Sequence, residues 1–399
     1  MEPGEFRGRT GRYAHDSEPW WPDAPAPPDG APNVLLVVLD DVGFAQLGCY
    51  GSDIDTPTLD RLAARWVAFS NFHTTAVCSP TRACVLTGRN HHTCGMGRIT
   101  DLATGFPGYD GWDRWREMVL PGQKELGVVP AHAELSPRPD WVPAWDDLSA
   151  DTQRVYARYM EAFAGFLSHT DAQIGRVVDW LDETDQLDDT VIVVLSDNGA
   201  SSEGGPTGSL NDARAWNALP RTVEEARDRI DEIGGPRIHN NYPWGWTVAG
   251  NTPFRRWKRE THEGGVADPL VVHWPRGITD AGGIRTQYVH AIDVLPTLLE
   301  AIGLEAPTAV DGVEQQPVEG VSFIYTFDDP DAPERHTTQY YEMFGCRAIY
   351  HEGWKAVTYH EIQADEPGLE RASWELYDLR ADPTECHDLA EERPSGCGS

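Results

Sequence analysis

Two uninterrupted apolar runs, each of strand length and each followed by acidic or amide side chains, constrain the fold of this chain most strongly. The first run, Val34 to Leu39, is followed directly by Asp40-Asp41. The second, Val191 to Leu195, is followed closely by Asp197-Asn198. Continuous apolar runs of this length are typical of strands that are buried on both faces of a parallel sheet. The chain is therefore expected to be an α/β protein.

Other segments show helical and extended patterns. Thr56-Pro57 indicates a helix start, and a long amphipathic pattern predicts a helix over about 150 to 183. Leu270 to Trp274 is expected to form another strand, and Ile292 to Ile302 another helix. These elements predict a mixed, mostly parallel central sheet flanked by helices.

The two ends of the chain differ from its middle. Residues 1–32 are rich in proline and glycine and predict an extended N-terminal arm. After about residue 325, short strand-like pieces with aromatic residues predict a small antiparallel α+β subdomain. We therefore expect an arm over 1–32, a large α/β domain over 33–325, and a C-terminal subdomain over 326–399.

Charge and composition narrow the class of partner. The formal net charge of -32 argues against binding nucleic acid or an acidic membrane surface, and favours small molecules or cations. No segment has the roughly 20 apolar residues of a membrane helix, so a cytoplasmic protein without membrane contact is expected. Seven cysteines, an odd number without Cys-x-x-Cys spacing, predict neither a disulfide framework nor a zinc site.

The polar residues that follow the two strands predict a metal site. Ligands in open α/β sheets gather beyond the carboxyl ends of the strands, so Asp40-Asp41 and Asp197-Asn198 are expected to share one crevice. Carboxylate and amide oxygens suit Ca²⁺ or Mg²⁺ better than zinc. The alternative is that acidic residues end these strands only because loops are solvated.

A third element strengthens this interpretation. Cys78 lies just before Pro80, which can serve as the first residue of a helix, so Cys78 would face the positive end of that helix. Arg82, one turn further on, could add a fixed positive charge to the same face. The alternative for Cys78 is a small buried hydrophobic residue.

The run from Cys78 to Arg82, followed by Leu86-Thr87-Gly88-Arg89, resembles the signature of the type I sulfatase family. Similarity to bacterial arylsulfatases extends from Pro32 to Leu379, and it implies an alkaline-phosphatase/sulfatase-like fold. In this family the cysteine is oxidised to formylglycine by a modification enzyme. Lys258, five residues before Glu263, matches the lysine that contacts the sulfate group. The metal ligands implied by the resemblance are Asp40, Asp41, Cys78, Asp197 and Asn198.

The resemblance also implies a mechanism. The aldehyde formed from Cys78 would hydrate to a diol, one oxygen of which binds the cation and attacks the sulfur of a small-molecule sulfate ester. The alcohol leaves, and the second hydroxyl then expels sulfate. Ca²⁺ is the expected cation and Mg²⁺ the alternative. The cation, Arg82 and Lys258 would stabilise the negative charge of the transition state.

One family feature is missing. The family's Gly-Lys-Trp-His segment and a later histidine have no counterpart, and an internal deletion is inferred near residues 108–113. Its loss is expected to leave strand edges unpaired. By motif, Lys124 and Lys355 cannot replace the missing lysine. Four histidines could replace the missing one: His91, His92, His239 and His262.

Three functions therefore stay open. The first is a sulfuric ester hydrolase that uses formylglycine and a divalent cation. The second is a phosphate or phosphonate ester hydrolase of the same superfamily. The third is a catalytically impaired, metal-binding deletion variant.

Overall fold

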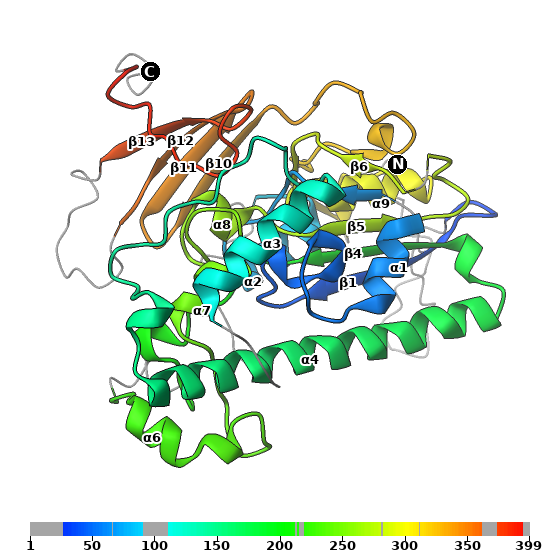
Figure 1. Ribbon diagram of the computed structural model, residues 1–399. Coiled ribbons are helices and arrows are strands. Elements are labelled where there is room, and N and C mark those ends of the chain that lie inside the picture. The colour runs from blue at the N-terminus through cyan, green and yellow to red at the C-terminus, as the bar shows by residue number, and fades with distance from the viewer. Residues whose placement is uncertain are drawn as a thin grey trace, which may run out of the picture.

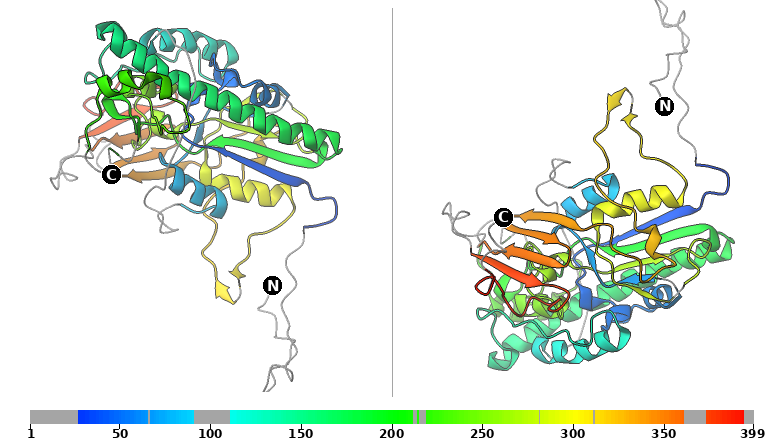
Figure 2. Two further views of the ribbon diagram at one scale, coloured as in Figure 1. Left: turned by 90° about the horizontal axis from the view of Figure 1, so that it is seen from below. Right: turned by 90° about the horizontal axis from the view of Figure 1, so that it is seen from above.

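The structure is a computed structural model of the 399-residue chain. It describes residues 27–65, 67–90, 111–211, 214, 219–280, 282–310, 312–360 and 373–393. A central sheet lies between two layers of helices, and a second sheet stands at one end of it (Figures 1 and 2). Most of the expected arm, and part of the inferred deletion point at 108–113, lie outside the described residues.

The central sheet has five strands in the order β1-β4-β5-β2-β6. Parallel pairs join β1 to β4 and β2 to β6, while β5 runs antiparallel to both β4 and β2. Four of the five strands therefore point the same way, which confirms the mixed, mostly parallel sheet. The strands are β1 (Asn33–Leu39), β2 (Val67–Phe69), β4 (Thr190–Ser196), β5 (Leu270–His273) and β6 (Ile284–Arg285).

The two long parallel strands differ in burial. Every residue of β4 is buried, as its apolar sequence predicted. In contrast, β1 is only partly buried, and Val34 is 40% exposed. The expectation of burial on both faces is wrong for β1, because within the described residues it pairs with β4 alone and forms an edge of the sheet. This open edge fits the unpaired strand edges expected from an internal deletion.

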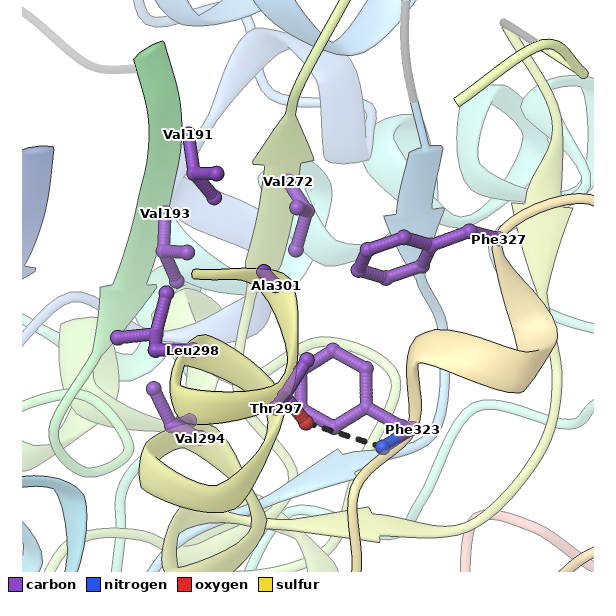
Figure 3. Close-up of a pocket in the computed structure, with 9 residues that line it drawn as sticks. All are labelled: Val191, Val193, Val272, Val294, Thr297, Leu298, Ala301, Phe323 and Phe327. Atoms are coloured by element: carbon purple, nitrogen blue, oxygen red, sulfur yellow. Dashed lines mark hydrogen bonds between the residues drawn. The ribbon is translucent and has the colours of Figure 1, made fainter. Parts of the chain in front are cut away.

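Helices cover both faces of the sheet. One face packs against α1 (Pro57–Arg65), α3 (Trp112–Leu126), α4 (Ala150–Glu183) and α7 (Trp244–Gly250). The other packs against α2 (Cys78–Thr87) and α9 (Val294–Ala301). On that second face, a small apolar cavity lies between β4, β5 and α9 (Figure 3).

The expected helices form close to their expected bounds. Thr56 stands just before α1, and its hydroxyl accepts a hydrogen bond from the Gly48 N–H at 2.8 Å. Ser149 caps α4 by accepting from the Thr152 N–H, so the 34-residue helix begins where the pattern predicted. No helix in the part of the chain described here is both long and apolar enough to cross a membrane.

The C-terminal region forms the expected antiparallel sheet. Its strands are β10 (Thr338–Met343), β11 (Cys346–His351), β12 (Trp354–Thr358) and β13 (Trp374–Asp378), hydrogen-bonded in that order. Tyr341, Tyr350 and Tyr377 of this sheet pack with Ala76 and Val266 of the α/β domain. The domain boundaries themselves stay predictions.

The shorter elements connect these layers. β3 (Phe72–His73) pairs in parallel with β7 (Val289–His290), and β8 (Ala309–Val310) pairs antiparallel with β9 (Val313–Glu314). Two short helices, α6 (Val223–Asp228) and α8 (Glu263–Val266), lie in the connections between the longer elements. Glu263, at the start of α8, contacts His73 of β3 and Lys355 of β12.

Candidate active site

The carboxyl ends of β1 and β4 bring the acidic residues together. Leu39 is in register with Ser196, so the residues that follow the two strands lie side by side. The Asp197 N–H donates to the Leu39 carbonyl at 3.1 Å, and the Asp41 N–H donates to Asp197 Oδ1 at 3.2 Å. The side chains that were predicted to come together therefore do so, and Asp40, Asp41 and Asp197 are called the carboxylate cluster from here on.

Asp41 has an unusual backbone conformation, and its carboxylate contacts Asn198 and Lys258. Its φ is 61°, a left-handed conformation that is unusual for a residue with a side chain. Asn198 Nδ2 donates to Asp41 Oδ1 at 2.7 Å, and the Lys258 ammonium pairs with the same oxygen. Burial opposes ionisation of Asp41, but the positive charge of Lys258 and the hydrogen bonds from Lys258, Asn198 and Ser201 together lower the pKa of this carboxyl.

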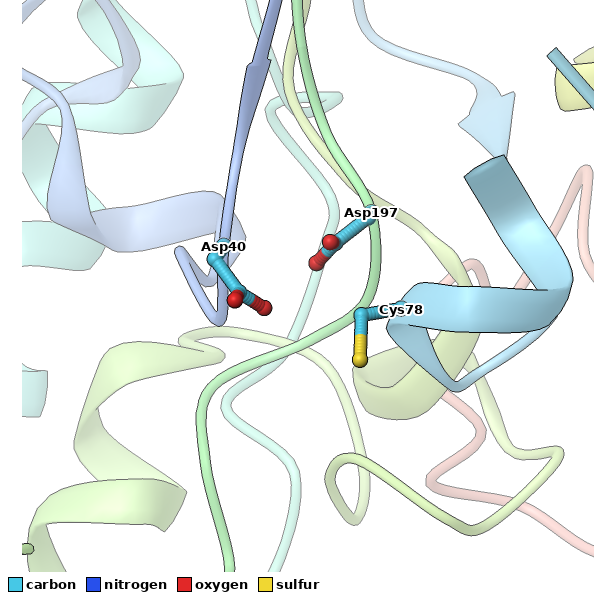
Figure 4. A group of neighbouring side chains, drawn as sticks. All are labelled: Asp40, Cys78 and Asp197. Atoms are coloured by element: carbon cyan, nitrogen blue, oxygen red, sulfur yellow. The ribbon is translucent and has the colours of Figure 1, made fainter. Parts of the chain in front are cut away.

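Cys78 faces this cluster from the start of α2. The helix begins at Cys78 itself, with Val77 as its N-cap residue, so the prediction that Pro80 is its first residue is wrong. Pro80 is tolerated because N–H groups in the first turn have no acceptor within the helix. Ligand atoms of Cys78, Asp40 and Asp197 all lie within 4.8 Å of one another (Figure 4).

Arg82 lies one turn along α2 and joins the same group. Its guanidinium contacts Asp197 Oδ2 through Nε at 2.9 Å, and lies 3.7 Å from Asp40 Oδ2. Its side chain is 43% exposed, and that of Asp40 is 53% exposed. These two side chains therefore form the open rim of the crevice, whereas Asp197 is fully buried below them.

The cluster fits a divalent cation. Burial, together with the charges of Asp40 and Asp41, raises the pKa of Asp197 well above its ordinary value. Oδ1 of the buried Asn198 has no hydrogen-bond partner among the described residues. Crowded carboxylates and an unpaired buried amide oxygen are a donor set that Ca²⁺ or Mg²⁺ would satisfy.

The Cys78 thiol is not an activated nucleophile in this setting. Burial raises its pKa to about 11, the neighbouring carboxylates of Asp197 and Asp40 act in the same direction, and Lys258 only partly opposes them. A thiol with this pKa is almost fully protonated at neutral pH. With no cation bound, the unmodified cysteine is therefore a weak nucleophile.

The structure brings the predicted Lys258 into the site. It is 4% exposed, and Asp41 and Glu203 raise its pKa although burial acts in the opposite direction. The next residue, Arg259, donates from its backbone N–H to the Ala76 carbonyl at 2.9 Å and pairs through its side chain with Glu203. Sequence reasoning missed Arg259 and Glu203, because their pairing joins loops 56 positions apart.

The histidines and remaining lysines lie in other settings. His262 is fully buried and hydrogen-bonds Glu375 of β13 at 3.1 Å, whereas His239 is exposed. His91 and His92 lie outside the described residues. Lys355 pairs with Glu263 below the C-terminal sheet. Among the described residues, none of the hydrogen bonds and ion pairs made by Asp40, Asp41 and Asp197 involves a histidine.

Two models of known protein families match this chain. The family model described as Sulfatase matches residues 32–120 and 126–304, more than half of the chain. A second model, described as the C-terminal region of N-sulphoglucosamine sulphohydrolase, matches residues 255–395.

Individual relatives agree with the family models. An uncharacterized sulfatase of Schizosaccharomyces pombe is 24% identical, with 91% of each chain covered. Human arylsulfatase A is also 24% identical, with 90% of this chain and 83% of the relative covered. The crystal structure of a phosphonate monoester hydrolase of Agrobacterium radiobacter has a TM-score of 0.51 at 16% identity, covering 92% of both chains. The last similarity concerns the fold alone.

The lengths of the alignments bear on the missing segment. The alignment with the Schizosaccharomyces pombe relative runs over 519 positions, 120 more than the residues of this chain. At least that many positions of the alignment therefore have no residue of this chain opposite them. This difference supports a shortened chain, while the position of the deletion near 108–113 stays a prediction.

Proposed function

Because the chain belongs to the sulfatase family and is a sulfuric ester hydrolase, we propose that formylglycine formed from Cys78 is its nucleophile, next to a divalent cation. The observation that carries this proposal is the convergence of Cys78 with the carboxylate cluster at the first turn of α2. Four residues besides residue 78 would hold the cation: Asp40, Asp41, Asp197 and Asn198.

Ca²⁺ is the proposed cation. The donors are hard oxygen atoms, and Ca²⁺ accepts a larger and more flexible set of them than Mg²⁺. When bound, the cation supplies positive charge that polarises the sulfate group and offsets the carboxylates around it.

The chain's own cationic groups would bind the sulfate. Arg82 stands at the open rim, where its guanidinium can reach a sulfate oxygen while Asp197 holds it in place. The Lys258 ammonium is fixed by Asp41 at the base of the crevice. The N–H groups in the first turn of α2 add the positive end of a helix. Together they stabilise the negative charge that develops on the sulfate oxygens in the transition state.

Whether the departing oxygen can be protonated decides which class of sulfate ester is hydrolysed fastest. No histidine contact with the carboxylate cluster is present in the described residues, so no imidazole there is assigned to protonate the departing oxygen. Phenols leave as stable anions without such help, whereas aliphatic alcohols need a proton. Sulfate esters of acidic phenols are therefore the proposed substrates.

The proposed partners are a small-molecule sulfate ester and a formylglycine-generating enzyme. Cys78 is buried in the folded chain. The modifying enzyme would therefore act before α2 packs onto the sheet. The cytoplasmic location stays a prediction of the sequence.

Mass spectrometry and a paired assay test the proposal. The peptide that ends at Arg82 is analysed for formylglycine at position 78, and the same sample is assayed with 4-nitrophenyl sulfate and 4-nitrophenyl phosphate in the presence of Ca²⁺. We expect the modification, with faster hydrolysis of the sulfate ester, and no hydrolysis by Cys78→Ala. Faster hydrolysis of the phosphate would favour the alternative chemistry. A modified chain that hydrolyses neither ester would be an impaired deletion variant.

A further inference from the structure

The turn between β10 and β11 carries an aromatic residue in an unfavourable position. Met343 pairs with Cys346, so Phe344 and Gly345 form a two-residue loop. Their φ angles are 53° and 87°, both in the left-handed region. Loops of this kind strongly prefer Asn-Gly, and a bulky residue at positive φ is uncommon. The phenylalanine is therefore not explained by the requirements of the turn.

The same turn reaches the nucleophile. Phe344 is half-buried and packs against a cluster that consists of Val77, Cys78 and Met343. This contact brings the C-terminal sheet to the first turn of α2, where the substrate's sulfur must bind. The strained residue thus lies at the reacting end of the site, which is where unfavourable backbone conformations tend to serve function.

Arg259 completes the surroundings of Phe344. The Arg259 guanidinium lies 5.6 Å from the centre of the Phe344 ring, and its Nε donates to Glu203 at 2.8 Å. Because Glu203 neutralises this guanidinium, Arg259 is a poor receptor for a second anionic group of a substrate. With a net charge of -32, the chain also repels polyanions. The wall that Phe344 presents beside Cys78 is therefore aromatic, and the ion pair next to its ring carries no net charge.

We propose that Phe344 is a specificity-determining residue whose ring contacts the organic group of a small aromatic sulfate ester during hydrolysis. An aromatic wall favours a planar, uncharged leaving group through ring contacts and burial of apolar surface. This inference rests on the proposed function of Cys78, since it uses the same crevice.

The test measures binding separately from turnover. Benzenesulfonate and methanesulfonate resemble the ester but cannot be hydrolysed, and calorimetry of the calcium-loaded protein gives the affinity of each. We expect the wild type to prefer benzenesulfonate, and Phe344→Asn to weaken benzenesulfonate about tenfold, since 1.4 kcal/mol corresponds to tenfold in affinity. Methanesulfonate affinity should be unchanged. For 4-nitrophenyl sulfate, KM should rise with little change in kcat.

Three controls separate this role from a structural one. Phe344→Asn introduces the residue that the turn prefers, so its thermal midpoint should not fall below that of the wild type. Phe344→Tyr keeps the ring and should keep the preference. Ile349→Asn, at an exposed position of the same hairpin, should change neither affinity.

Two results would overturn the inference. One is equal affinity of the wild type for both sulfonates, and the other is an equal loss of both affinities in Phe344→Asn. If the wild type prefers benzenesulfonate but hydrolyses no ester, the proposed catalytic function fails while the role of Phe344 in binding stands.

Discussion

Two buried lysines in this chain have opposite surroundings. Lys355 pairs with Glu263 at 2.6 Å and with Glu385 at 3.0 Å, and Glu263 also contacts His73 at 3.0 Å. In this buried group, the ammonium of Lys355 and the carboxylates of Glu263 and Glu385 are paired with one another. Lys258 instead pairs with one member of a cluster of three carboxylates that opens to solvent at Asp40. Lys355, whose charge is balanced by buried carboxylates, stabilises the fold. Lys258, which lies beside a partly exposed carboxylate cluster, can also interact with a ligand.

The largest effect expected concerns Lys258. Lys258→Met removes a fixed positive charge from the proposed sulfate-binding site. We expect kcat for 4-nitrophenyl sulfate to fall about 10²–10³-fold, the usual loss for one group that stabilises transition-state charge. Steady-state kinetics with the calcium-loaded protein measures this loss. A change of less than about threefold would contradict a role of Lys258 in charge stabilisation.

The matched substitution at the other lysine should act on stability instead. Lys355→Met leaves two buried carboxylates without their cation, so the free energy of unfolding should fall by about 3–5 kcal/mol. Urea denaturation followed by tryptophan fluorescence measures it. Adding Glu263→Gln should recover part of the loss, because it removes one of the uncompensated charges. If Lys355→Met abolished kcat without lowering stability, the contrast between the two lysines would be wrong.

Binding of Ca²⁺ should stabilise the folded protein through the carboxylate cluster beside Lys258 and not through the group around Lys355. A ligand that binds only the folded state at a hundred times its Kd stabilises it by about 2.7 kcal/mol. We expect Ca²⁺ to raise the thermal midpoint of the wild type and of Lys355→Met, and a chelator to reverse the rise. Asp197→Asn should not respond. A rise that persisted in Asp197→Asn would place the ion outside the carboxylate cluster.

The smallest effect expected is a dependence of the free energy of unfolding on pH in the acidic range. Burial opposes ionisation of Glu263, but Lys355 and His73 outweigh it and lower its pKa to about 2 from an ordinary value of 4.5. The unfolded chain therefore takes up this proton first as the pH falls, and the contribution present above pH 4.5 is lost toward pH 2. Glu263→Gln should therefore lose less stability than the wild type between pH 4.5 and pH 2. Parallel pH curves of the two proteins would contradict this assignment.

The sequence predicted those parts of the site that depend on local pattern. The strand ends at Asp40 and Asp197, and the motif from Cys78 to Arg82, could be read from runs of neighbouring residues, and the structure brings them together. The same patterns could not show that β1 lies at an edge, because burial depends on which strand pairs with it.

The contacts that shape the rest of the crevice were beyond local pattern. Phe344 reaches the Cys78 cluster from a different sheet, and Arg259 pairs with Glu203 across two loops. The only signal was a Phe-Gly pair between two strand-like segments, which indicates a turn but not its neighbour. Tertiary packing alone determines such contacts.

Among the strands that the structure describes, β1 forms an open edge of the central sheet, and this edge has a consequence for how the chain reaches its native state. Its sequence, NVLLVVL, contains no charged residue or proline, although edge strands usually carry one as protection against pairing with another chain. Folding of one chain is a first-order process, whereas pairing of two such edges is second-order. The yield of native protein should therefore depend on the concentration at which it is refolded, and dilution should favour the monomer.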